Sequence, residues 1–121
     1  MNAPVLQFPA GDWSGVPVEQ VGDGVARQMV WGDRLMVCRL KLAPRVITAA
    51  HTHPHEQITV VVRGRAVFKV GDEQRIVSAG DVIYFEPGIL HGATMLDEEV
   101  ELIDIFSPVR EDFLPGRADG R

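Results

Sequence analysis

Residues 51–70 read HTHPHEQITVVVRGRAVFKV and hold three of the four histidines in the chain. From residue 57 onward the stretch is rich in β-branched residues on both sides of Arg63-Gly64, which is typical of two short strands joined by a tight turn. The fourth histidine, His91, follows about forty residues later. Side chains alternate along an extended segment, so His51 and His53 are expected to lie on one face. Because imidazole is a common ligand of transition metals, the clustering predicts one metal site.

The rest of the chain continues this pattern of short apolar runs between Gly, Pro and Asp, and no segment keeps a helical period. The predicted strands are Arg34–Leu42, Ile47–His53, Gln57–Val62, Arg65–Val70, Gln74–Val77, Val82–Phe85, His91–Leu96 and Val100–Phe106. Strands at this spacing favour an all-β fold closed into a small barrel or double-sheet jelly roll, which also protects the sheet edges.

A chain of 121 residues fits a single domain. We expect residues 1–20 to form an extended N-terminal arm, residues 21–107 the barrel, and residues 108–121 a C-terminal segment and tail. The arm contains apolar residues that cannot be buried locally, namely Val5, Leu6, Phe8 and Trp13. An arm of this kind can lie across a second subunit, so a homodimer is expected.

Composition and charge exclude several classes of partner. The net charge is −5 and the only lysines are Lys41 and Lys69, so there is no basic surface for nucleic acid. No apolar run approaches the roughly 20 residues that span a bilayer, and no membrane partner is expected. The single cysteine, Cys38, lies in an apolar stretch and is expected to be a small buried hydrophobe. A cytoplasmic location follows as the expectation.

The predicted barrel constrains the metal site further. Two imidazoles aimed at one point of a desolvated cavity are costly unless a cation occupies that point. A third ligand is expected about four residues after His53, and a fourth from a strand across the barrel, where His91 lies. Gln57 has the appropriate spacing. His55 and Glu56 are the alternatives, because the proline between His53 and His55 can introduce a bulge.

The two histidine segments resemble the motifs of the cupin family. The first cupin motif is His-x-His, three or four residues, Glu, six residues, Gly; the second is Gly, five residues, Pro-x-Gly-x-x-His. The matching positions are His51, His53, Gln57 and Gly64 in the first motif, and Gly80, Gly88 and His91 in the second. The departures are Gln57 in place of Glu, a proline displaced by one position at Glu86-Pro87, and Met95 where Asn is common.

This resemblance spans residues 45–107 and implies a cupin-type double-stranded β-helix with three His and one Gln as ligands. A neutral ligand set leaves the charge of a divalent cation uncompensated, which favours a small anionic substrate. One divalent transition metal per subunit is expected, and this ligand set accepts Ni, Zn, Fe, Mn or Co.

A narrower resemblance adds residues 103–114, IDIFSPVREDFL, to the histidine run. Together they resemble the KdgF group of small single-domain cupins, which are pectin degradation proteins. The resemblance implies a metal-dependent enzyme of uronate catabolism that converts 4,5-unsaturated monouronates to linear ketonised 4-deoxy-5-keto-uronates. It also implies Asp104, Phe106 and Arg110 as the catalytic residues.

The chemistry of these three residue types is consistent with that implication. Alternation places Asp104 and Phe106 on one strand face, where a buried carboxylate near a cation can transfer protons. The planar fork of Arg110 suits a substrate carboxylate. The alternatives are that Asp104 lies in water at a strand end, that Arg110 pairs with Glu111 or Asp112, and that Phe106 is only a core residue.

Two other functions fit the same residues. One is a different metal-dependent cupin enzyme, a dioxygenase or a polyketide cyclase, which metal identity and oxygen consumption would distinguish. The other is a non-catalytic module that binds a sugar or small anion, which would tolerate loss of Asp104.

Overall fold

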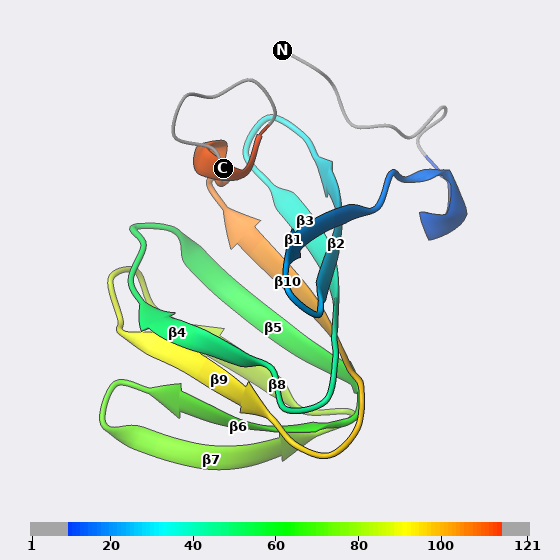
Figure 1. Ribbon diagram of the computed structural model, residues 1–121. Helices are drawn as coiled ribbons and strands as arrows, with labels where there is room; N and C mark the ends of the chain where they lie inside the picture. Colours follow the sequence, from blue (N-terminus) through cyan, green and yellow to red (C-terminus); the bar gives the residue numbers. More distant parts are fainter. Residues whose placement is uncertain (1–9, 115–121) are drawn as a thin grey trace.

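The computed structural model describes residues 10–114, which form two antiparallel sheets facing each other (Figure 1). The strands are β1 (Glu19–Gly22), β2 (Val25–Trp31), β3 (Met36–Leu42), β4 (Ile47–His51), β5 (Glu56–Arg63), β6 (Arg65–Val70), β7 (Glu73–Ser78), β8 (Val82–Phe85), β9 (His91–Met95) and β10 (Val100–Ser107). Sheet A has the order β1-β2-β3-β10-β5-β8, and sheet B has the order β4-β9-β6-β7. The only helical elements among these residues are two short 3-10 turns, η1 (Trp13–Gly15) and η2 (Glu111–Phe113).

The predicted all-β jelly-roll fold is confirmed. The strands expected at residues 65–70 and 82–85 have the observed bounds, and the other six agree within two residues at each end. The match is good because each strand is an apolar run bounded by turn residues. At Gly64, for example, φ is +87° and an added Cβ would lie 2.5 Å from the carbonyl oxygen of Glu99, so this turn requires glycine.

Strands β1 and β2 were not predicted. They form a hairpin around Asp23-Gly24, a dipeptide typical of tight two-residue turns, with Gly24 at φ +78°. Polar residues in β2, including Arg27 and Gln28, obscured its alternation. The expected N-terminal arm therefore ends in a strand, since β1 begins at residue 19, while residues 1–9 of that arm lie outside the described part of the chain.

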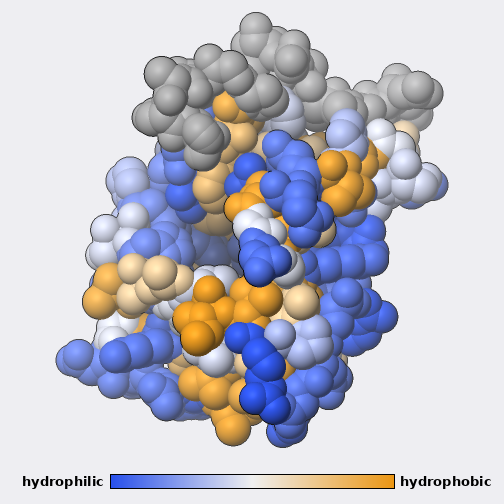
Figure 2. Space-filling view, in the orientation of Figure 1, coloured by the Kyte–Doolittle hydropathy of each residue, from blue (hydrophilic) through white to orange (hydrophobic). Residues whose placement is uncertain are grey.

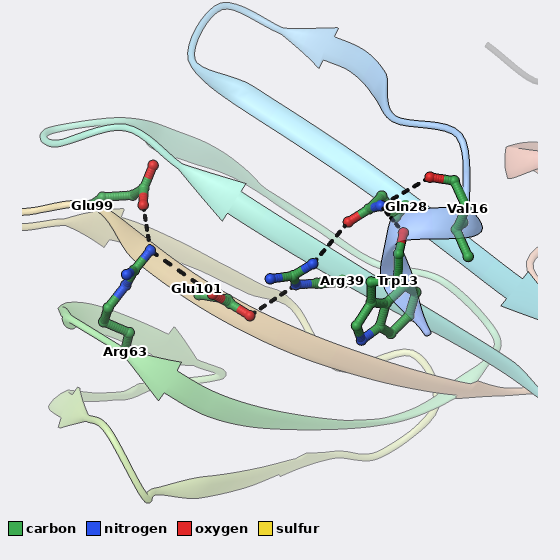
Figure 3. Close-up of polar contacts among 7 residues, drawn as sticks. All are labelled: Trp13, Val16, Gln28, Arg39, Arg63, Glu99 and Glu101. Carbon is green, nitrogen blue, oxygen red and sulfur yellow. Dashed lines mark hydrogen bonds and ion pairs between the residues drawn. The ribbon is translucent and has the colours of Figure 1, made fainter. Parts of the chain in front are cut away.

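The segment before β1 is held on sheet A by a polar network on its outer face (Figure 3). Gln28 Nε2 donates to the carbonyl oxygens of Trp13 and Val16 at 2.8 and 2.9 Å. Arg39 donates from Nη1 to Gln28 Oε1 at 3.2 Å and from Nε to Glu101 Oε2 at 2.9 Å. These bonds link η1 to β2, β3 and β10.

The space between the sheets holds two clusters of buried apolar side chains. The larger cluster lies between the sheets around Phe68, Phe85 and Val100, and the smaller one packs Phe106 with Met36. In Figure 1 the sheets join at the end where β5 turns into β6, and they diverge at the opposite end, where β4 stops and β5 begins. That open end is where the histidines lie.

The surface seen in Figure 2 carries separate apolar patches divided by hydrophilic side chains. Ile47 on the edge strand β4 and Leu90 before β9 are exposed apolar residues of sheet B and its connections. No helix within residues 10–114 has the length and apolar character needed to cross a membrane.

Candidate metal centre and the cavity beside it

Three histidines converge at the open end of the sandwich. His51 is the last residue of β4 and His91 is the first residue of β9, and the two are directly paired in the sheet B register. One ring nitrogen from each of His51, His53 and His91 lies within 4.8 Å of the others. The ring centroids of His51 and His91 are 4.4 Å apart, and those of His53 and His91 are 4.9 Å apart. The three histidines expected to share a site are therefore together.

His53 reaches this cluster from a connection and not from a strand. The strand predicted to run to His53 ends at His51, because the β4 register shifts between Thr48 and His51 and Pro54 removes a backbone donor. The connection is fixed instead by a hydrogen bond from the Gly88 amide to the His53 carbonyl oxygen at 2.9 Å. The turn at Gly88, just before His91, thus fixes the position of His53.

Gly92 allows β9 to approach β4 closely. An added Cβ at Gly92 would lie 3.0 Å from the Thr48 carbonyl oxygen and 3.1 Å from backbone atoms of Ala50. We expect Gly92→Ala to push β4 away and to separate His51 from His91. The free energy of unfolding should fall by about 1–3 kcal/mol, and Zn²⁺ binding should weaken at least tenfold. Calorimetric titration and thermal unfolding measure both effects. Gly15→Ala, which meets nothing within 4 Å, is the control, and equal behaviour of the two variants would contradict the expectation.

Backbone carbonyls set the tautomer of all three imidazoles. Nδ1 of His51, His53 and His91 lies 3.0, 3.1 and 2.9 Å from the carbonyl oxygens of Ala49, His55 and Ile89, respectively. A carbonyl oxygen only accepts, so each Nδ1 carries the proton and each Nε2 presents a lone pair. This is the arrangement in which histidine binds a metal through Nε2.

Gln57 stands beside the histidine cluster on β5. Its Oε1 lies 2.9 Å from His53 Nε2, and its Nε2 donates to Thr59 Oγ1 at 2.9 Å. Thr59 in turn donates to Asp104 Oδ1 at 2.6 Å. A continuous polar chain therefore runs from His53 to Asp104 through the interior of sheet A.

The donor set fits a divalent metal. With Nδ1 of His53 protonated, its Nε2 and the facing Gln57 Oε1 are both acceptors, and two lone pairs 2.9 Å apart repel unless a cation lies between or beside them. Such a spacing is ordinary for two ligands of one transition metal. The residues that would hold the ion are His51, His53, Gln57 and His91, and the set of imidazole and amide oxygen donors suits a transition metal.

The two alternative ligands lie elsewhere. Glu56 is exposed on the outer face of sheet A, where it accepts a 2.6 Å hydrogen bond from Tyr84. His55 is buried, but it is outside the cluster of three, and its Nδ1 has no hydrogen-bond partner among the described residues. Burial and the charge of Arg110 lower the pKa of His55.

Asp104 points inward from β10, opposite Thr59 on β5 and Cys38 on β3. It lines a cavity of about 170 Å³, and His51, His91 and Gln57 line the same cavity. Burial raises the pKa of the Asp104 carboxyl to about 6, against the opposing effects of the Thr59 hydrogen bond and the Arg110 charge. The alternative in which Asp104 lies in water at a strand end is therefore wrong.

Arg110 and Phe106 line the same cavity. The Arg110 guanidinium is buried between aromatic rings, 4.0 Å from the centroid of Phe113 and 5.2 Å from that of Phe106. Asp112 accepts from its Nε at 3.2 Å and its Nη2 at 2.8 Å. The alternative in which Arg110 pairs with an acidic neighbour is therefore confirmed for Asp112, and Arg110 also lines the cavity.

The imidazoles of His53 and His91 are neutral at neutral pH. Burial lowers the pKa of His53 to about 4, with the Arg110 charge acting in the same direction, and burial also lowers the pKa of His91. A neutral imidazole is the form that binds a metal, so protons compete weakly at these positions. Cys38 is buried in the apolar interior, as expected, and burial raises the pKa of its thiol to about 12.

A family model of the cupin domain matches residues 38–106, which include strands β4 to β9 and all but the last residue of β10. The chain belongs to the cupin family. This cupin is 38% identical over 100 residues to the pectin degradation protein KdgF of Dickeya dadantii, an alignment that covers 81% of the chain and 91% of that relative.

Two solved cupin structures extend the comparison. An RmlC-like cupin from Shewanella frigidimarina is 31% identical with a TM-score of 0.84, covering 93% of this cupin and 100% of that structure. KdgF from a Halomonas species is 32% identical with a TM-score of 0.77, and the match covers 81% of this cupin and 93% of that structure. The predicted resemblance to KdgF is confirmed.

Sequence reasoning missed one residue of this cupin's site, Thr59. Thr59 alternates with Gln57 on β5, so the period of two was a sufficient signal that its hydroxyl faces the interior. Asp112 entered the sequence analysis only as an alternative partner of Arg110. Its carboxylate holds the guanidinium at the cavity wall.

Proposed function

We propose that this cupin is a metal-dependent enzyme of uronate catabolism that converts 4,5-unsaturated monouronates to linear ketonised 4-deoxy-5-keto-uronates. The observation that carries the proposal is one cavity that joins the histidine cluster to the half-buried carboxylate of Asp104 and the buried guanidinium of Arg110. Support comes from the 38% identity to the pectin degradation protein KdgF. A cytoplasmic enzyme that takes one divalent metal per subunit is part of the proposal.

The cavity suits a small anionic substrate. Its volume of about 170 Å³ has room for a molecule the size of one sugar ring. Asp112 occupies two N–H groups of Arg110, and the remaining donors of the guanidinium suit the substrate carboxylate. Phe106, held at the cavity wall against Phe113, provides an apolar surface for the ring.

Asp104 is the proton-transfer group in this proposal. Ring opening of a hemiketal and conversion of an enol to a ketone both need a proton removed at one atom and delivered at another. A carboxyl whose pKa is raised to about 6 exchanges protons readily near neutral pH. A bound divalent metal would polarise the substrate oxygen, and Thr59 holds the Asp104 carboxylate in place.

The decisive assay follows the ultraviolet absorbance of unsaturated galacturonate and mannuronate monomers. We expect metal-loaded protein to accelerate the loss of this absorbance and EDTA-treated protein to leave it unchanged. Adding Ni, Zn, Fe, Mn or Co to the EDTA-treated protein then identifies the active metal. Oxygen uptake is measured in parallel, since uptake with no absorbance change would assign a dioxygenase instead. Tight uronate binding without turnover would assign a non-catalytic sugar-binding module.

We also propose that the protein is a homodimer that pairs the outer faces of two A sheets. The outward residues in register across five strands form an apolar row, made up of Val30, Val37, Ile105, Ile58 and Tyr84. At one end the row meets an apolar groove of about 430 Å³ beneath Trp13 and Val16, just after residues 1–9 with their apolar Val5, Leu6 and Phe8. Arg39 and Glu101, which flank the row, are paired with each other, and Glu56 beside its end accepts a hydrogen bond from Tyr84, so a twofold axis can bring apolar row against apolar row.

Light scattering tests this pairing. The wild-type protein is expected to have the mass of a dimer, and Ile58→Asp, which places a charge within the apolar row, is expected to weaken the dimer at least 100-fold. Ile76→Asp is the matched control, because Ile76 is also an exposed isoleucine but lies on β7 of the other sheet. A monomeric wild type at 100 µM, or dissociation by both variants alike, would contradict the proposed interface.

A further inference from the structure

Thr59 is a fully buried polar residue on the inner face of sheet A. It is 0% exposed on β5, and it faces inward between Gln57 and Val61. Its hydroxyl contacts a side chain on each side, accepting from Gln57 Nε2 at 2.9 Å and donating to Asp104 Oδ1 at 2.6 Å. The buried Thr59 hydroxyl therefore constrains the orientation of two polar side chains.

The direction of these hydrogen bonds is determined from the carboxylate end. An ionised carboxylate has no proton, so the single hydroxyl proton of Thr59 goes to Asp104. The Thr59 oxygen can then only accept, and the group it accepts from must be the amide N–H₂ of Gln57. The opposite end of that amide, Oε1, is thereby turned toward His53.

The orientation of the Gln57 amide matters for a metal. An amide oxygen is a good ligand, whereas the nitrogen of a neutral amide carries no available lone pair. If the amide were reversed, its N–H₂ would face the histidine cluster, and its oxygen would face a Thr59 oxygen that has no proton left to give. The cluster would then offer three lone pairs instead of four.

We propose that Thr59 is a positioning residue whose hydroxyl fixes the Gln57 carboxamide with its oxygen toward the three histidines. Through the same hydroxyl, Thr59 links the metal centre to Asp104. The inference deepens the proposed function and rests on its metal centre, but it does not depend on the identity of the substrate.

The test compares Thr59→Val, which removes the hydroxyl and keeps the shape, with Thr59→Ser, which keeps the hydroxyl. Binding of Zn²⁺ is measured by competition with a chelator, and bound Co²⁺ is examined by its visible absorption spectrum. We expect Thr59→Val to weaken Zn²⁺ binding by 10- to 100-fold and to alter the Co²⁺ spectrum. Thr59→Ser is expected to stay within threefold of wild type with an unchanged spectrum.

Two controls separate positioning from general destabilisation. Val61→Ala truncates the next inward residue of β5, which is buried but outside the polar chain, so it should lower thermal stability and leave Zn²⁺ affinity unchanged. The second control is a double-mutant cycle with Gln57→Glu. A carboxylate presents an oxygen at either end, so the effect of Thr59→Val on affinity should fall below threefold when it is combined with Gln57→Glu.

The inference is overturned if Thr59→Val binds Zn²⁺ within threefold of wild type, or if its loss of affinity is the same with Gln57 and with Gln57→Glu. A wild-type protein that binds Zn²⁺ and Co²⁺ as described but leaves unsaturated uronates unchanged would remove the proposed function while the inference on Thr59 stands. A wild type that binds neither ion would remove both.

Discussion

Replacing His91 with Ala is expected to weaken metal binding by at least 100-fold and to abolish turnover. His91 supplies one of three converging imidazoles, and because its Nδ1 donates to the Ile89 carbonyl, its Nε2 is the ligand atom that the variant loses. Metal content of the purified variant, affinity for Zn²⁺ and the absorbance assay measure the effect. Its position against Phe85, with ring centroids 4.5 Å apart, means that truncation leaves a space the size of an imidazole.

That space provides a rescue experiment. Millimolar imidazole added to His91→Ala is expected to restore part of the metal affinity, which a general loss of folding would not allow. His55→Ala is the matched control, because His55 is a buried histidine next to the cluster whose side chain takes no part in it. Full metal content in His91→Ala, or its loss in His55→Ala, would show that the ligand set is assigned wrongly.

Much of this site was predictable because its signals are local. His51, His53 and Gln57 lie within seven consecutive positions, and period-two alternation with Pro54 as a break is enough to predict their convergence. His91 follows a turn whose glycine is also recognisable from sequence. The strands that carry these residues are apolar runs bounded by turn residues, and they were predicted within two positions.

The parts that were missed depend on contacts between residues distant in sequence. The role of Thr59 requires Asp104, which is 45 positions away and is brought opposite by the pairing of β5 with β10. No local pattern encodes that register. The hairpin of β1 and β2 was missed for another reason, since polar side chains such as Gln28 are stabilised there by bonds to the backbone of η1 and not by burial of apolar surface.

Asp104→Asn is expected to retain the metal and to lower kcat by about 100- to 10,000-fold, the usual contribution of a general acid or base. Asn is preferable to Ala because its Oδ1 still accepts from Thr59, so the orientation of Gln57 is preserved while the exchangeable carboxyl proton is lost. Metal content and Zn²⁺ affinity should remain within a few-fold of wild type. Wild-type kcat in Asp104→Asn would refute the proton-transfer role without affecting the metal centre.

The same variant gives a prediction for folding of the metal-free protein. The pKa of Asp104 is raised from 3.8 to about 6 in the folded state, so its contribution to stability is complete below pH 3.8 and is lost as the pH rises through 6. Asn does not titrate. The free energy of unfolding of Asp104→Asn relative to wild type should therefore increase by about 2–3 kcal/mol between pH 4 and pH 7.5.

Urea unfolding in EDTA at these two pH values measures that difference, and taking the difference between variant and wild type cancels the titration of groups common to both. Bound Zn²⁺ should reduce this pH-dependent difference in the free energy of unfolding, because a nearby cation favours the ionised carboxylate and lowers the pKa of Asp104. A difference that stays constant with pH would mean that the carboxylate is already ionised in the folded protein at pH 4. In that case burial would not control its protonation, and Asp104 would act as a fixed negative charge beside the metal centre instead of a group that exchanges protons near neutrality.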